Sequence, residues 1–291
     1  MINLELLDIK LHDISRLQYA NLESRKIWSK KINKASRDSK RIKFNNLKSG
    51  KIKCLLWEVN YDKLDNVMKD LLFLGYVVTP LNDIDFLIKK KFKVLIANQE
   101  NSIKFLNALE KQDFETLSQL TNIPKCCIKF NIDNIKYSDD LIWFQAKNSL
   151  NSDLKKKEAI FEGKIDKHFI RLKYGTEEYK IYSTFEKLGI GILNYRPCSF
   201  SCKESLIVAN DYINNAKQDN VDVDNILDIL KLPFEWDCLK GIANINTPVF
   251  KLVINSVTCY PNYVVQRESD YYPEEAPNGI KFPWRFPWEN K

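Results

Sequence analysis

Two short cysteine motifs, separated by a long stretch of chain, place the strongest constraint on how this sequence can fold. The first, IPKCCIKF at 123–130, contains the adjacent thiols Cys126 and Cys127. The second, RPCSFSCKES at 196–205, contains Cys198 and Cys202. A fold that brings the two motifs together assembles four sulfurs at one site, whereas any other fold leaves four small residues that pack in the core.

The first motif is predicted to begin a helix. Pro124 suits the first helical turn, where its missing N–H is no loss, and Thr121 or Asn122 is the expected cap. Cys126 and Cys127 would then lie in that first turn.

The second motif is also predicted to begin a helix. Ser201 and Glu204 form a capping-box pattern, which places Cys202 at the first helical position and Cys198 in the turn before it. The positive end of a helix dipole stabilises a thiolate, by about 0.3–1 kcal/mol at an exposed site. Thiolate is the form of cysteine that binds metal or attacks an electrophile.

The start of the chain bears on the redox state of the seven cysteines. MINLELLDIKLHD has acids where a secretory signal would have basic residues and an apolar segment, so the expected location is the cytoplasm. Thiols stay reduced there, which favours metal or thiol chemistry over a disulfide framework. Three interpretations stay open at this point: a metal or cluster site, a reactive thiol pair, and plain packing of small apolar residues.

A metal site of this kind would hold zinc or an iron–sulfur cluster, both of which take up to four cysteine ligands. Adjacent cysteines reach one centre only with strain, so Cys126 and Cys127 are expected to divide, one ligating and the other packing. Cys54 lies in an apolar run and is assigned to the core, while Cys238 and Cys259 are possible additional ligands.

The paired motifs resemble a cysteine signature, PxCCxxxF followed by PCxxxCxxS, of an uncharacterised family of bacterial and archaeal proteins with a domain of unknown function. The resemblance covers residues 113–215 and implies that the four cysteines work together, without implying a particular reaction. Tyr195 and Arg196 stand just before the second motif, where a histidine ligand would have strengthened the metal interpretation.

The alternation of patterns predicts an α+β fold. Residues 1–50 read as a basic helical arm, helical over 10–34, followed by a polar linker that begins near residue 33. Residues 51–291 read as one globular domain with three parts. These are an α/β unit at 51–112, a helical cysteine-bearing region at 113–232 that includes a short strand at IGILNY, and a β hairpin with an extended tail rich in proline and aromatic residues at 233–291. In the α/β unit, strands are predicted at IKCLLWEV and FKVLIAN and helices at YDKLDNVMKDLLFLGY and NSIKFLNALEKQ, the second helix capped by Asn101 or Ser102. The hairpin is predicted from PVFKLVINSVT and YVVQRES.

Positive charge is concentrated near the N-terminus. Residues 23–53 carry twelve Lys or Arg against two acids, and the rest of the chain has a slight excess of acids. Such a cluster predicts contact with RNA or another polyanion through residues 23–53. The alternative is a solvated helix face that an AT-rich coding sequence has enriched in lysine. The apolar runs are too short for a bilayer span, so no membrane association is expected.

Other chemistries have little support. The two histidines, His12 and His168, share no motif, and the acids Glu268, Asp270, Glu274 and Glu275 are as consistent with a solvated loop as with a cation site. The sequence therefore predicts a metal- or thiol-dependent enzyme with metal ligands Cys126, Cys127, Cys198 and Cys202, acting on a small molecule or a modified nucleoside. The alternative is a non-catalytic nucleic-acid-binding module in which the same cysteines hold a structural zinc.

Overall fold

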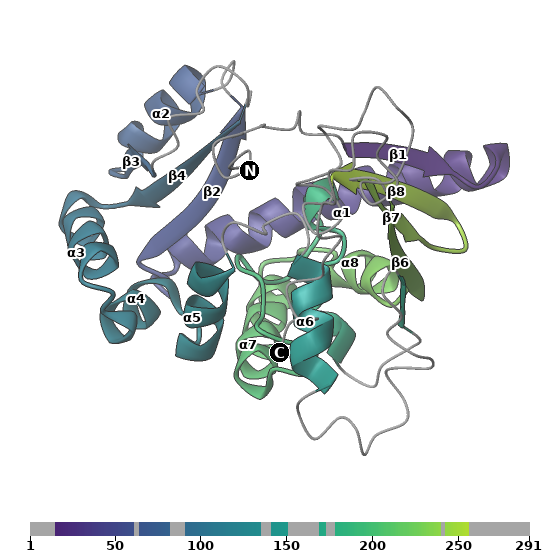
Figure 1. Ribbon diagram of the computed structural model, residues 1–291. Helices are drawn as coiled ribbons and strands as arrows, with labels where there is room; N and C mark the ends of the chain where they lie inside the picture. The colour runs from purple at the N-terminus through teal and green to yellow at the C-terminus, as the bar shows by residue number, and fades with distance from the viewer. Residues whose placement is uncertain are drawn as a thin grey trace, which may run out of the picture.

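Two antiparallel sheets and a set of helices make up the chain, which confirms the predicted α+β class. The computed structural model (Figure 1) describes residues 15–60, 64–81, 91–134, 141–150, 169–172, 178–239 and 242–255. The larger sheet has the order β1-β8-β7-β6-β5 and consists of β1 (Ser15–Tyr19), β5 (Phe169–Leu172), β6 (Phe234–Leu239), β7 (Ile242–Asn246) and β8 (Phe250–Asn255). The smaller sheet has the order β2-β4-β3 and consists of β2 (Cys54–Asn60), β3 (Val77–Pro80) and β4 (Lys91–Ala97).

The described helices differ greatly in length. They are α1 (Leu22–Lys48), α2 (Leu64–Phe73), α3 (Gln99–Glu110), α4 (Phe114–Thr121), α5 (Lys125–Asp133), α6 (Leu141–Leu150), α7 (Lys203–Gln218) and α8 (Val223–Leu230), with short 3-10 turns at Glu178–Ile181 and Glu186–Leu188. None of the described helices is both long and apolar enough to cross a bilayer.

The longest helix, α1, corrects the predicted arm and linker. Its 27 residues include most of the stretch expected to be a polar linker, and residues 15–19 of the expected N-terminal helix form strand β1 instead. Asn21 caps α1, because its side-chain oxygen accepts the Ser24 N–H at 2.7 Å. The buried residues of α1, which include Ile32, Ala35 and Ile42, recur at helical spacing and form a narrow stripe. The polar residues between them made this stripe hard to recognise in the sequence.

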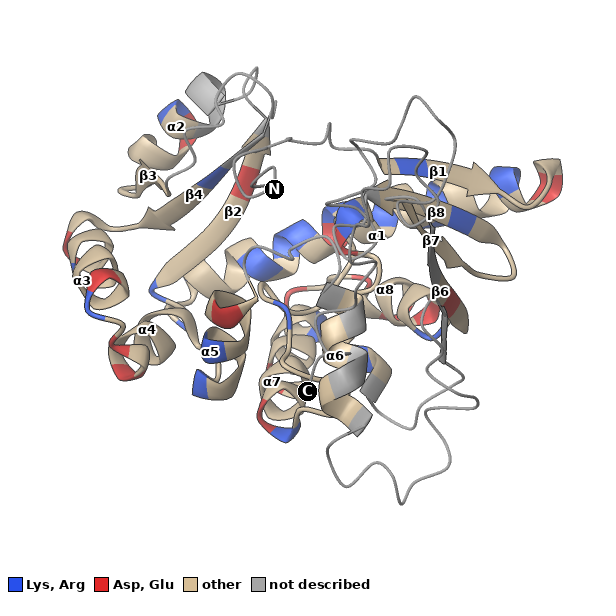
Figure 2. Cartoon of the chain, viewed as in Figure 1, with Lys and Arg blue, Asp and Glu red and all other residues tan. Residues whose placement is uncertain are grey.

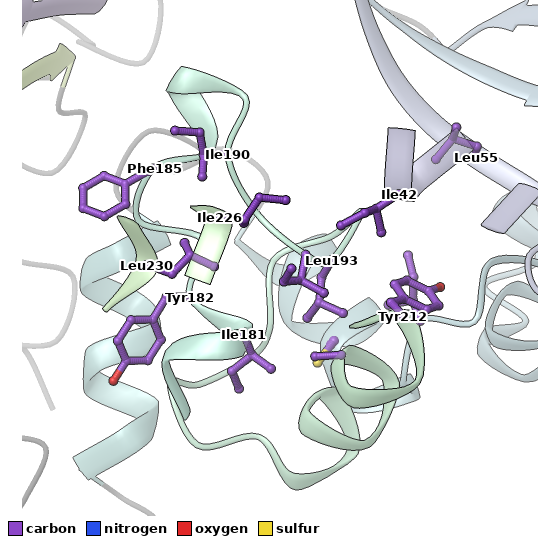
Figure 3. Packing of buried hydrophobic residues seen from close by; sticks show 14 of the residues in the cluster. Ile42, Leu55, Ile181, Tyr182, Phe185, Ile190, Leu193, Tyr212, Ile226 and Leu230 are labelled. Carbon is purple, nitrogen blue, oxygen red and sulfur yellow. The ribbon is translucent and has the colours of Figure 1, made fainter. Parts of the chain in front are cut away.

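Helix α1 runs through the middle of the molecule between the two sheets (Figure 1). It contacts β1 of the larger sheet, β2 of the smaller sheet, and helices α7 and α8. Figure 3 shows Ile42 of α1 in one cluster with Leu55, Leu193 and Tyr212, which come from β2, the segment before the second cysteine motif, and α7. The predicted arm is therefore a central part of the core, while the predicted domain boundaries stay a prediction.

The predicted α/β unit is present, with corrections in detail. The two predicted strands are β2 and β4, the two predicted helices are α2 and α3, and Gly75 after α2 has a φ of 81° that favours glycine. Strand β3 was not predicted, and all pairings in this sheet are antiparallel. Asn98 caps α3 by accepting the Asn101 N–H at 2.8 Å, so the prediction of Asn101 or Ser102 as the cap was wrong.

The region at 113–232 is mainly helical in its described residues, as predicted, but IGILNY at 190–195 forms bends rather than a strand. Ile190, Ile192 and Leu193 of this segment are nevertheless buried. An apolar run gives the same sequence signal in a buried strand and in an irregular segment that covers the core.

The predicted C-terminal hairpin is described only in its first strand. Over its described residues, β8 pairs with β7 along one edge and with β1 along the other. The predicted second strand YVVQRES, the tail, Cys259, the acids at 268–275 and both histidines lie outside the described residues. Cys238 stands opposite Ala243 in the β6–β7 pair.

Replacing the buried Ile42 by alanine tests whether α1 belongs to the core. Ile42 is 1% exposed, so Ile42→Ala should lower the free energy of unfolding by about 2–5 kcal/mol in urea denaturation. Ile27→Ala is the matched control on the same helix, because Ile27 is 49% exposed and its change should cost under about 0.5 kcal/mol. Equal stabilities of the two variants would mean that α1 does not pack as described.

Candidate metal centre

The four cysteine sulfurs of the two motifs converge at one place. The Sγ atoms of Cys126 and Cys202 are 3.8 Å apart, those of Cys127 and Cys202 are 3.7 Å apart, and those of Cys126 and Cys127 are 3.8 Å apart. With Cys198, all four sulfurs lie within 4.8 Å of one another. The predicted convergence is confirmed, and both adjacent cysteines, one of which was expected to pack rather than ligate, bring their sulfurs into the cluster.

The turn between α4 and α5 positions the first pair. Asn122 adopts the left-handed conformation, with φ of 56°, and ends α4 rather than capping α5. Pro124 occupies the N-cap position of α5 rather than a position inside the first turn, and its carbonyl accepts the Cys127 N–H at 2.8 Å. Cys126 and Cys127 therefore lie in the first turn of α5, as predicted.

The N-terminus of α7 positions the second pair. Cys202 is the N-cap residue of α7 and makes no side-chain cap hydrogen bond, so the Ser201–Glu204 capping box, which placed Cys202 inside the helix, was wrong by one position. Cys198 lies in the preceding turns. Two helix N-termini thus meet at the sulfurs, and each presents the positive end of its dipole to them.

Exposure to solvent differs among the four thiols. Cys127 is fully buried and Cys202 is 7% exposed, Cys198 is half-buried, and Cys126 is exposed. The site therefore opens to solvent on the Cys126 side. Cys54 is fully buried in β2, as predicted, and lies outside the cluster.

Polar groups of the surrounding chain contact the buried sulfur of Cys127. The Cys198 backbone N–H donates to this sulfur at 3.3 Å, and the Ser205 hydroxyl lies 3.2 Å from it. The Tyr195 hydroxyl in turn lies 3.2 Å from the Ser205 hydroxyl. Such donors stabilise negative charge on a thiolate, and they orient the ligands of metal sites in proteins.

Tyr195 and Arg196, the two residues directly before the second motif, have structural roles. Besides the Tyr195 contact, Arg196 pairs with Glu186 through two guanidinium nitrogens. This bidentate pair fixes the chain directly before Pro197 and Cys198.

Asn131 of α5 joins the two motifs directly. Its side-chain amide donates to the Cys127 carbonyl and to the Arg196 carbonyl, both at 2.7 Å. The Asn131 side chain therefore ties the helix of the first motif to the segment that leads into the second.

Helix α6 holds the second motif through three polar side chains. Gln145 donates to the Pro197 carbonyl at 2.7 Å, and Asn148 donates to the Cys198 carbonyl at 2.9 Å. The Ser149 hydroxyl accepts the Phe200 N–H at 2.8 Å. These residues and Asn131 were not predicted from the sequence. The available signal was a set of three polar residues at helical spacing in the segment LIWFQAKNSL.

Without a metal, the thiols share protons unequally. Hydrogen bonds from Cys127 and Cys198 lower the pKa of Cys202 to about 2. Hydrogen bonding with Cys198 and Cys202, together with burial, raises the pKa of Cys127 above its ordinary value. Burial and the nearby negative charge of Cys202 likewise raise the pKa of Cys126. The metal-free cluster thus concentrates its negative charge on Cys202 and keeps its neighbours protonated.

The spacing of the sulfurs fits a single metal ion. A tetrahedral ion with metal–sulfur bonds of about 2.3 Å holds its ligand sulfurs about 3.8 Å apart. The three separations among Cys126, Cys127 and Cys202 have this value. Among the described residues, the four cysteines form the one group of at least three metal-ligating side chains that converges in this way.

No known protein family matches this sequence, and no curated protein or solved structure shows significant similarity to it. The resemblance of the two motifs to a bacterial and archaeal cysteine signature therefore stays a prediction.

The Asn131 bridge should contribute measurably to the site. Asn131→Ala leaves the Cys127 and Arg196 carbonyls without this donor, so the free energy of unfolding should fall by about 1–3 kcal/mol. Asn134→Ala is the control, because among the described residues the Asn134 side chain donates to the Phe130 carbonyl of α5 and not to the second motif. If both variants unfold at the same urea concentration, Asn131 does not join the motifs.

Proposed function

We propose that the four cysteines bind one tetrahedral zinc ion as a structural centre. The observation that carries the proposal is the set of sulfur separations, 3.7–3.8 Å among three of the four ligands, which equals the edge of a zinc–thiolate tetrahedron. The support comes from two helix N-termini, a backbone N–H and a hydroxyl that all favour negative charge at the sulfurs.

An iron–sulfur cluster fits these separations less well. In a four-iron cluster each cysteine binds a different iron atom, so the ligand sulfurs surround an inorganic core of several atoms. They must then stand farther apart than the edge of one tetrahedron. The compact arrangement of Cys126, Cys127 and Cys202 favours a single ion instead.

A structural role fits the ligand set better than a catalytic one. Catalytic zinc sites keep one coordination position open for water or substrate, whereas four protein ligands close the coordination sphere. The ion would join the N-terminus of α5 to the N-terminus of α7 and to the turns before it. The geometry thus supports the predicted structural zinc over the predicted enzyme acting on a small molecule or a modified nucleoside.

Metal analysis of the purified protein tests the zinc site. We expect one zinc per chain, and cobalt substitution should give the visible absorption of a tetrahedral thiolate site. Loss of a hydrogen-bond partner of a ligand weakens metal binding by roughly 10–100-fold. Cys202→Ser removes a ligand itself, so it should weaken zinc binding by more than this. It should also lower stability, because metal binding contributes to folding.

Cys54→Ser is the matched control for this experiment. Cys54 is a buried cysteine outside the cluster, so its serine variant should keep one zinc per chain. If the wild-type protein contains iron and acid-labile sulfide, the centre is an iron–sulfur cluster rather than a zinc site. Failure of the metal-free protein to take up any zinc would contradict the proposal.

The exposed face of α1 supports a second function, binding of RNA or another polyanion. Lys26, Lys30, Arg37 and Lys40 are all exposed, and within the described part of the chain no acid lies at ion-pair distance from them. With about 3.6 residues per turn, these four positions fall within roughly a quarter of the helix circumference. Figure 2 shows the basic residues following one another along α1. We call these four side chains the basic stripe.

The other faces of α1 are occupied by ion pairs and by core residues, so the basic stripe is separate from them. Lys34 pairs with Asp222 at the start of α8, and Arg41 pairs with Asp38 of its own helix. The buried residues Ala35 and Ile42 point away from the stripe. Cations on the stripe are therefore available to phosphates, whose counterions would be released on contact.

Charge reversal tests the basic stripe. The triple variant Lys26→Glu, Lys30→Glu and Lys40→Glu should weaken binding to bulk transfer RNA and reduce the slope of log affinity against log salt by about 2–3. The matched control changes three exposed lysines elsewhere to glutamate, namely Lys111, Lys129 and Lys217. Equal losses of RNA affinity in both triple variants would indicate an effect of net charge alone. If the affinity of the wild-type protein for RNA did not depend on salt concentration, the proposal would be contradicted.

A further inference from the structure

Cys126 differs from the other three ligands in its access to solvent. It is the exposed member of the cluster, whereas Cys127 is fully buried, Cys202 is nearly so and Cys198 is half-buried. An oxidant that arrives from solvent therefore meets Cys126 first. Oxidation of cysteine requires both thiolate character and access, and a metal-bound thiolate has the first property.

We propose that Cys126 is the site at which hydrogen peroxide or a related hydroperoxide opens the metal centre, by forming a disulfide with Cys202 and releasing the ion. This inference rests on the proposed zinc site and adds a chemical reaction to it. It assigns different roles to the four ligands, with Cys126 as the attacking thiolate and Cys202 as the resolving one.

Geometry selects Cys202 over Cys127 as the partner. Both sulfurs lie within 3.8 Å of the Cys126 sulfur. The Cα atoms of adjacent residues such as Cys126 and Cys127 are only about 3.8 Å apart across a trans peptide, below the roughly 4.4–6.8 Å that an ordinary disulfide requires. Cys202 belongs to a separate helix and has no such constraint, so small movements of the two helix N-termini can close the bond.

The reaction balances with peroxide as the sole oxidant. The Cys126 thiolate attacks one peroxide oxygen, the O–O bond breaks, and hydroxide leaves and takes up a proton, so that Cys126 becomes a sulfenic acid. The Cys202 thiolate then attacks the Cys126 sulfur, the S–O bond breaks, and a second hydroxide leaves as water after protonation. Two thiolates, one peroxide and two protons thus yield one disulfide and two waters.

Loss of two ligands explains release of the ion. Only Cys127 and Cys198 would remain, and a structural zinc site needs four protein ligands. The new disulfide would still link α5 to α7, so the two helices would stay together while the metal departs. A dithiol reductant should restore the thiols and, with zinc present, the centre.

The test uses the full-length protein loaded with zinc. Peroxide is added in steps, released zinc is followed with a colorimetric chelator, and cysteines are mapped by mass spectrometry after rapid alkylation. We expect zinc release to parallel the appearance of a Cys126–Cys202 disulfide, and a dithiol with added zinc to reverse both. Initial oxidation at another cysteine, or zinc release with Cys126 intact, would overturn the proposal.

Two histidine substitutions give matched variants, because histidine is also a zinc ligand. Cys126→His should slow peroxide-driven zinc release at least about tenfold, since the accessible thiolate is gone. Cys198→His has the same ligand set but keeps Cys126 and Cys202, so it should release zinc at nearly the wild-type rate. Equal rates in the two variants would contradict the assignment to Cys126.

The mapping of the wild-type protein decides the question even if a histidine variant fails to fold. Zinc content is measured before peroxide is added, which separates the two proposals. A protein that takes up no zinc contradicts the proposed centre and this inference with it. A zinc-loaded protein whose Cys126 is not oxidised first contradicts this inference alone.

Discussion

Mutual repulsion of four closely spaced sulfurs is the constraint on which the site depends. Two unit charges about 4 Å apart near a protein surface repel by about 4 kcal/mol, so four thiolates cannot share this space without compensation. The metal-free chain responds by leaving the charge on Cys202 and raising the pKa values of Cys126 and Cys127. A divalent cation at the centre would attract all four thiolates at once and offset two of their four negative charges, which is why the spacing argues for a bound ion rather than for packed thiols.

Most of the surrounding structure serves to keep the sulfurs in place. Asn131 ties α5 to the chain before Pro197, and Gln145 and Ser149 of α6 hold the turns that carry Cys198. These contacts use backbone carbonyl and N–H groups of an irregular segment, which would otherwise be buried without partners. The cysteine ligands are thus positioned by a network of amide and hydroxyl side chains, and the metal would act on a site whose backbone is already ordered.

The four cysteines of the cluster could be picked out from the sequence, because cysteines next to a proline at two predicted helix starts are local signals. The sequence could not reveal the hydrogen-bond partners of Asn131 and Gln145, since an asparagine or glutamine in a helix gives no sign of the distant carbonyl to which it donates. Cap positions were misplaced by one residue at Cys202 and by more at Asn122, because several polar residues near each helix start could have served. The strand and helix types of the α/β unit were predictable from periodicity, whereas the antiparallel order of its strands depends on contacts between distant segments.

Helix α1 shows why composition misleads. Its many lysines suggest a solvated linker, yet small or apolar residues such as Ala35 and Ile42 form a buried face. The helix contacts strands of both sheets and the helices α7 and α8. The basic stripe lies on the opposite face, where the geometry of the helix sets the spacing of its charges. The cysteine cluster lies at the N-terminus of α7, which packs on the buried side of α1. The basic stripe and α7 therefore lie on opposite sides of one helix, so a change at the cluster would leave the charge pattern of the stripe unchanged as long as α1 stays folded.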